Sequence, residues 1–73
     1  MNQYALYYNG QRDELAPVLT CKDFMQARYY FKRHLVMIGE LESIAQPAPA
    51  AYSIGFASGY ETRNINNIQH YAI

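Results

Sequence analysis

The feature that most constrains this chain is a single run of helical apolar spacing between residues 20 and 39, TCKDFMQARYYFKRHLVMIG. At about 100° per residue, one stripe of this run contains Phe24, Ala27, Phe31, Leu35 and Ile38. Thr20 can cap the first amides, Asp23 places a carboxylate near the positive end of the helix dipole, and Gly39 tolerates the left-handed backbone that ends helices. The run therefore predicts one helix over about residues 21–38, with its apolar stripe facing a core.

The opposite face of this helix carries more apolar side chains than a helix needs when it packs against a single sheet. A helix that covers a single sheet usually shows charged and amide groups there, whereas this one shows Met25, Tyr29 and Val36. In one interpretation these side chains lean over the edges of the core. In the other they form a contact patch for another protein, with Lys32 and Arg33 as its rim, because Tyr, Met and Arg are enriched at interfaces.

The first strand is predicted by the alternation of large side chains over residues 4–8. An Asn-Gly pair at 9–10 follows it, which is the strongest short-range signal for a hairpin. The return strand should run over about 12–19 and lie at an edge, because Pro17 cannot donate to a ladder. Tyr7 is expected on the exposed side of the first strand, where it would give a second patch for a partner.

The middle of the chain contains one further clear strand. Residues 40–45 fit a short strand or a helix extension equally well, and the carboxylates of this segment are expected to be solvated. The prolines in 46–51 favour an extended connector. Residues 52–57 alternate large and small side chains, which predicts a strand. Its small face of Ser, Gly and Ala allows close approach of other groups, so Gly55 is expected at the tightest contact.

The last quarter of the chain is ambiguous. A strand is expected somewhere in 60–72, with a bend near 66–67 and a final short strand over 70–73, although the spacing within 65–73 also fits a helix. The resulting order is strand, strand, helix, optional strand, strand, strand. It predicts an α+β fold in which a small antiparallel sheet of about four strands has one helix on one face. Residues 1–73 form one domain in this interpretation.

Size and charge restrict the classes of function. A chain of 73 residues can bury only about 60% of its unfolded surface, and oligomerisation is a common remedy, so a homodimer is expected. Six basic and six acidic residues cancel, which leaves no long-range attraction to nucleic acid or to an anionic membrane. The chain shows neither a signal-peptide pattern nor a long apolar span, so we expect a soluble, cytoplasmic protein with no membrane partner.

Chemical motifs are scarce. Cys21 is expected near the start of the helix beside Lys22, where a thiol pKa can be lowered, and the sequence leaves its reactivity open. Nucleophilic catalysis also requires a positioned base, yet no local motif ties His34 or His70 to this cysteine. The histidines and the cysteine have no metal-ligand spacing, and no glycine-rich phosphate loop is present. We therefore expect no enzyme activity, no metal and no cofactor.

Two binding functions are open at this stage. The first is binding to another protein through Met25, Tyr29, Lys32, Arg33 and Val36, with Tyr7 as a second site. The second is binding to single-stranded nucleic acid, in which strand tyrosines stack on bases at about 1–3 kcal/mol each and helix Lys and Arg side chains contact phosphates. The balanced charge and the lack of an aromatic-basic signature favour the protein partner.

In size and character, a motif-free α+β chain with eight tyrosines resembles the accessory proteins that phages and mobile elements carry, including small inhibitors of bacterial defence systems. The resemblance implies occlusion or displacement, in which a compact domain blocks a larger host protein without turnover. The expected function is therefore a non-enzymatic module that acts by stoichiometric contact with a second copy, a larger host protein, or both.

Overall fold

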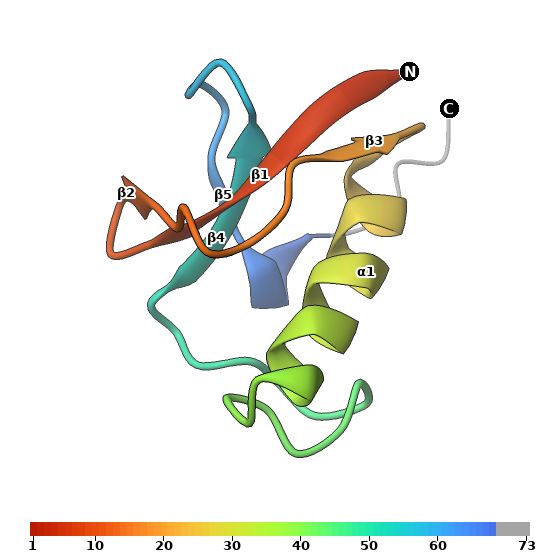
Figure 1. Ribbon diagram of the computed structural model, residues 1–73, viewed down its shortest axis with the longest axis vertical. Coiled ribbons are helices and arrows are strands. Elements are labelled where there is room, and N and C mark those ends of the chain that lie inside the picture. Colours follow the sequence, from red (N-terminus) through yellow and green to blue (C-terminus); the bar gives the residue numbers. More distant parts are fainter. Residues whose placement is uncertain (69–73) are drawn as a thin grey trace.

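The structure is a computed structural model that describes residues 1–68, and it shows an antiparallel sheet with one helix packed against it (Figure 1). In chain order the elements are β1 (Asn2–Tyr8), β2 (Gln11–Arg12), β3 (Leu19–Cys21), α1 (Phe24–Met37), β4 (Tyr52–Phe56), β5 (Arg63–Asn64) and the 3₁₀ helix η1 (Ile65–Asn67). The predicted α+β class is confirmed.

The sheet is organised around β1. The strand order is β2-β1-β4-β5. Strands β2 and β3 both pair with the same edge of β1: β2 pairs with residues 7–8 and β3 with residues 2–4. Asn9 and Gly10 have φ values of 50° and 79°, the left-handed pair that a tight hairpin of this type requires. The predicted hairpin is confirmed.

The return strand is shorter than the expected 12–19. Only its two ends pair with β1, as β2 and as the start of β3. Between them the chain turns, because the Asp13 carboxylate accepts a hydrogen bond from the Leu15 amide at 3.1 Å and the Asp13 carbonyl accepts one from the Ala16 amide. Pro17, which has no amide hydrogen, follows in the same connection.

Helix α1 begins later than the sequence predicts. Asp23 is its N-cap, and the carboxylate accepts a hydrogen bond from the Gln26 amide at 2.9 Å. Thr20, the expected cap, lies in β3 opposite Gln3, so pairing with β1 removes it from the helix. At the other end Gly39 has a φ of 81° and ends the helix as expected.

The predicted apolar stripe of α1 is confirmed for Phe24, Ala27, Phe31 and Leu35, which are all buried. Ile38 is the exception. It is the C-cap and is 51% exposed, because the backbone leaves the helix there and Leu41 turns back into the core instead. The sheet contributes further core side chains, of which the fully buried ones are Tyr4, Leu6, Cys21 and Ile54.

The second face of β4 is closely covered, as its small side chains predict. A Cβ atom on Gly55 would lie 2.7 Å from Thr62 Cγ2 and 3.2 Å from Tyr7 Cε2. Both distances are shorter than an ordinary contact, so only glycine fits between these two residues. Gly55 is therefore a point of tight packing.

The segments around β4 and β5 are held mainly by asparagine side chains. Residues 40–45 form turns, so neither the strand nor the helix extension expected there occurs. Asn66 binds both backbone groups of Ala48, at 2.7 and 2.6 Å, and the Asn64 amide donates to the Ala50 carbonyl at 2.7 Å. The expected bend near 66–67 is η1. The final strand expected over 70–73 lies outside the described residues.

Candidate functional site

The outer face of α1 presents a stripe of exposed side chains. Tyr29, Tyr30 and Met37 are 50%, 43% and 81% exposed, and Arg33 is exposed between them. The two tyrosine rings meet edge to face with centroids 5.5 Å apart, and the Arg33 guanidinium lies over the Tyr29 ring at 5.9 Å. These contacts within one helix give its exposed face an aromatic and cationic surface.

The sequence-predicted patch is partly assembled on this face. Met25 lines a shallow depression of about 360 Å³ together with Tyr29 and Tyr30. Met25 and Val36 are half-buried and pack against the core. The structure therefore brings Met25, Tyr29 and Arg33 to one surface, while Val36 serves both the core and the margin of that surface.

Lys32 does not form the exposed rim that we expected, since it is only 4% exposed. It lies four residues after Arg28, on the side of α1 where the Arg28 Nε atom donates to the Ile65 carbonyl at 2.9 Å. Burial lowers the pKa of Lys32, and the nearby Arg28 lowers it further. The structure thus buries a helix position that the spacing alone assigns to the rim of the exposed patch.

Tyr7 is also not exposed, so the expected second patch is wrong in that respect. The ring is 6% exposed, lies close to Gly55, and its hydroxyl donates to the Phe56 carbonyl at 2.8 Å. Thr62 and Gly59 lie in the turn that approaches the same face of β4. Tyr7 therefore belongs to the packing of the sheet.

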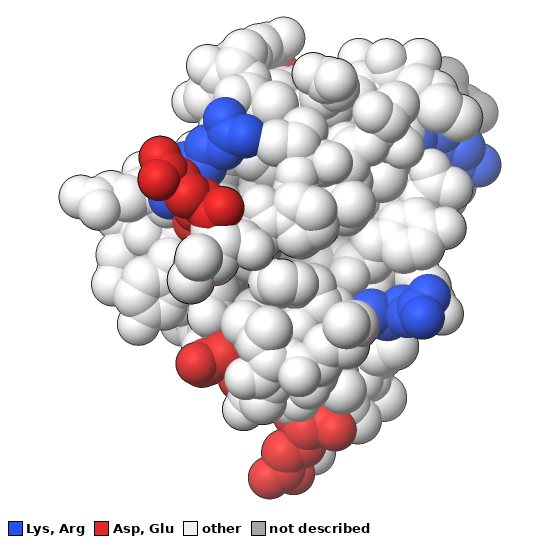
Figure 2. All heavy atoms as spheres, viewed as in Figure 1, with Lys and Arg blue, Asp and Glu red and all other residues white. Residues whose placement is uncertain are grey.

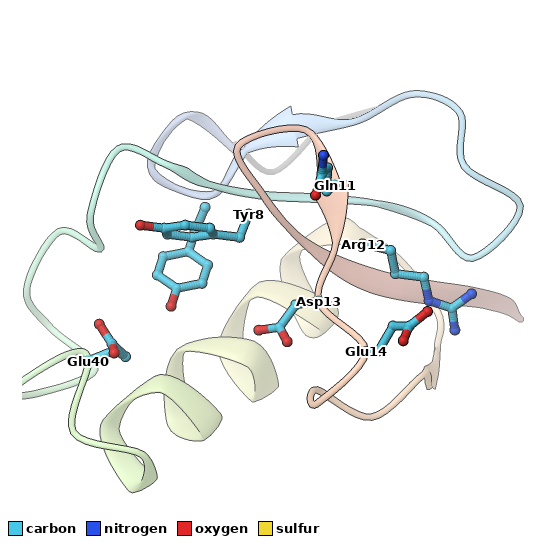
Figure 3. A pocket seen from close by; sticks show the side chains of 7 residues that line it. Tyr8, Gln11, Arg12, Asp13, Glu14 and Glu40 are labelled. Carbon is cyan, nitrogen blue, oxygen red and sulfur yellow. The ribbon is translucent and has the colours of Figure 1, made fainter.

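Sequence reasoning missed a groove at the hairpin end of the sheet. It has a volume of about 770 Å³ and is lined by Tyr8, Gln11, Arg12, Asp13, Glu14, Glu40 and Tyr52 (Figure 3). Tyr8 and Tyr52 are direct partners in the β1–β4 ladder, and their rings meet at 5.1 Å with an angle of 59°. Strand alternation could have paired these two tyrosines, but nothing in the sequence places Glu40 beside them.

The groove is negatively charged. Its three carboxylates and one guanidinium give the lining a formal net charge of −2. Burial raises the pKa of the Tyr52 hydroxyl, and the carboxylates of Glu40 and Asp13 raise it further. Two aromatic rings and two carboxylates from distant parts of the chain therefore line the same groove.

Cys21 is a poor candidate for a nucleophile. The side chain is 1% exposed, and burial together with the nearby Asp23 carboxylate raises the pKa of its thiol. A raised pKa reduces the fraction of reactive thiolate. Within residues 1–68, no group of three or more His, Cys, Asp or Glu side chains is placed to hold a metal ion.

The strand tyrosines do not provide an open stacking surface for bases. Tyr4, Tyr7 and Tyr52 are all buried, and only Tyr8 among the described strand tyrosines is substantially exposed. Figure 2 shows Lys and Arg side chains dispersed over the visible face between large uncharged areas, with no single basic patch. Both observations count against the nucleic-acid alternative.

Comparisons with protein-family models, with curated proteins and with solved structures find no significant match to this chain. In the part of the chain that the structure describes, no helix has the length and apolar character needed to cross a membrane.

Proposed function

We propose that this protein is a non-enzymatic protein-binding module that acts by stoichiometric contact through the outer face of α1. One observation supports the proposal above the others: Tyr29, Tyr30, Arg33 and Met37 are exposed together on a single helix. Large aromatic, Met and Arg side chains are the types that dominate binding energy at protein interfaces.

The helix is a suitable base for such a surface because its other face is fixed in the core by Phe31 and Leu35, both fully buried. Side chains that are already ordered lose less entropy when a partner binds. The ring contact between Tyr29 and Tyr30 and the Arg33 contact with Tyr29 supply part of this order.

The chemistry of the face indicates the kind of surface that it fits. Met37 and the tyrosine rings require an apolar recess, and Arg33 requires a carboxylate or carbonyl group near the rim of that recess. The partner in this proposal is a second copy of the chain, a larger host protein, or both. In the role that phage and mobile-element accessory proteins suggest, the module occludes a functional surface of a host defence protein.

The test replaces Tyr29 and Met37 together by Ser. Both are at least half exposed, so the fold should persist, as checked by circular dichroism. Interface hot spots are worth more than about 1 kcal/mol each, so we expect association to weaken at least about 30-fold. Mass is measured by light scattering over a concentration series, and partner recovery is measured by quantitative affinity capture.

Leu15→Ser is the matched control, because Leu15 is an apolar residue that is 93% exposed but lies outside α1. It should leave both measurements unchanged. Unchanged mass together with unchanged capture in the Tyr29 and Met37 double variant would refute the proposed function.

A further inference from the structure

We propose that the partner of the outer face of α1 is a second copy of this chain, and that the two α1 helices pack antiparallel about a two-fold axis near residues 31–32. This arrangement rests on the function proposed above and specifies both the partner and its orientation. Three features of α1 support it: a projecting side chain at one end, a depression at the other, and opposite charges beyond the two ends.

The projection and the depression suit each other. Met37, the last residue of α1, is 81% exposed, and an unbranched methionine adapts its shape to a recess. The depression of about 360 Å³ lies over the first turns of α1, where Met25, Tyr29 and Tyr30 contribute to its lining. A two-fold interface repeats each contact in both directions. Met37 of each copy would therefore fill the depression of the other copy.

The position of the axis follows from these two features. The lining of the depression extends from Lys22 to Tyr30, with its midpoint at residue 26, about 16 Å along the helix from Met37 at 1.5 Å per residue. An antiparallel contact between residues 26 and 37 puts the axis midway between 31 and 32. Arg33 of one copy then lies opposite Tyr30 of the other. The two Arg33 side chains flank the axis as like charges, and the tyrosine rings offset part of that repulsion.

The two ends of α1 carry opposite charges. Lys22 is exposed just before α1, and its amide donates to the Gln26 side chain at 2.8 Å, which keeps it beside the first turn. The nearby Asp23 carboxylate is directed to the helix amides as the N-cap. Glu40 and Glu42 are exposed just after α1, and Figure 2 shows acidic side chains at the lower end of the molecule, where α1 ends in Figure 1.

This charge pattern favours the antiparallel orientation. In that orientation Lys22 of each copy lies opposite the segment of the other copy that carries Glu40 and Glu42. The helix dipoles also oppose each other favourably. In a parallel pair, the two acidic segments would lie side by side and repel each other.

The size of the face predicts a reversible dimer. With 14 residues, α1 is about 21 Å long and about 10 Å wide. A stable interface buries about 800 Å² on each partner, roughly one sixth of the 4834 Å² surface of this chain. A surface one helix wide lies at the small end of the range of specific interfaces, so we expect a dissociation constant in the micromolar range.

The test uses the native protein. Equal amounts of ¹⁴N- and ¹⁵N-labelled chains are mixed and treated with a carbodiimide, which joins an amine to a carboxylate in direct contact. The sequence has two lysines, and Lys32 is only 4% exposed, so Lys22 is the accessible one. We expect mixed-isotope peptides that join Lys22 to Glu40 or Glu42. Within one copy this product is excluded, because the 14 residues of α1 separate these groups by about 21 Å.

Two results would overturn the dimer. One is a monomeric mass by light scattering up to millimolar concentration. The other is a dimer without a crosslink from Lys22 to Glu40 or Glu42, as parallel helices or a different interface would give. The proposed function fails by a different result, namely unchanged mass and unchanged capture in the Tyr29 and Met37 double variant. A monomeric protein that loses capture of a host partner in that variant would contradict the dimer and retain the binding face.

Charge reversal then tests the orientation. Lys22→Glu should weaken dimerisation by about two- to thirty-fold, because the two-fold axis makes each substitution act on two exposed ion pairs. Adding Glu42→Lys to this variant should restore part of the affinity. Arg12→Glu makes the same change of charge on an exposed residue of β2 and should have no effect. Equal weakening by Arg12→Glu and Lys22→Glu, or no recovery with Glu42→Lys, would contradict the antiparallel arrangement.

Discussion

Replacement of Gly55 by Ala tests the packing of the second sheet face. The added Cβ would lie 2.7 Å from Thr62 Cγ2, which is 0.7 Å shorter than the 3.4 Å at which ordinary contacts begin. It would also lie 3.2 Å from both Thr62 Cα and Tyr7 Cε2. Thr62 could rotate its methyl group away, but the backbone contact and the aromatic ring must then move as well.

The expected cost is that of overpacking a filled region, about 1–3 kcal/mol. A central value of about 2 kcal/mol should lower the midpoint of thermal unfolding by about 8–16 °C in a domain of this size. Urea unfolding followed by tyrosine fluorescence and circular dichroism measures the free energy, since the chain has eight Tyr and no Trp. The slope with urea should stay constant if only the folded state is strained.

A second substitution makes this prediction specific to the contact. Thr62→Ser removes Cγ2, the atom nearest to the added methyl group, and Thr62 is exposed, so this change alone should cost little. The Gly55→Ala, Thr62→Ser double variant should recover at least about 0.5 kcal/mol relative to additivity. A Gly55→Ala protein within about 0.5 kcal/mol of the wild type, or strictly additive variants, would show that Gly55 is not closely packed in solution.

Two further predictions concern buried titratable groups. Lys32→Met should raise the free energy of unfolding at pH 7 by about 1 kcal/mol, since it replaces a largely buried lysine side chain beside Arg28 by an apolar one. Because burial and Arg28 lower the pKa of Lys32 in the folded state, the unfolded chain binds this proton more tightly, and the contribution of Lys32 to stability rises as pH increases toward 10.5. Urea unfolding of both proteins should therefore show a smaller stability difference between Lys32→Met and the wild type at pH 10 than at pH 7. Cys21 should react with an aromatic disulfide reagent at least about 100-fold more slowly in the native protein than in urea, since an opening free energy of only about 2.7 kcal/mol produces that factor; equal rates would contradict the burial of the thiol.

The features that the sequence predicted well are those determined by near neighbours along the chain. The Asn-Gly pair at 9–10 specifies its turn through backbone preference alone, and the core stripe from Phe24 to Leu35 follows from helical spacing. Errors at the helix ends have a similarly clear cause. Thr20 has the chemistry of a cap, but its pairing with β1 prevails, and Asp23 takes the capping position.

The features that the sequence missed depend on contacts between distant segments. Tyr7 and Lys32 carry polar groups on long apolar side chains, so either can be exposed or covered. For Tyr7 the outcome depends on residues far along the chain, namely Phe56, whose carbonyl accepts a hydrogen bond from the Tyr7 hydroxyl, and Thr62. The groove requires Asp13 and Glu40 to meet a pair of tyrosines across the sheet. No hydrophobic periodicity or sequence motif indicates that these segments lie side by side. The exposure of Tyr29 and Arg33 on α1 could be predicted because helical spacing within one element determines it.

The short outer strands of the sheet limit how this molecule can associate. On one side of β1 lie β2 with two residues and β3 with three, and β5 along β4 has two. A sheet recruits another chain through a long row of free amides and carbonyls, which is also how domains swap strands and how fibrils grow. Edges this short offer little main chain to an incoming segment. Any association between copies should therefore join intact folded units, and the sheet edges within residues 1–68 should offer little template for fibril growth even at high concentration.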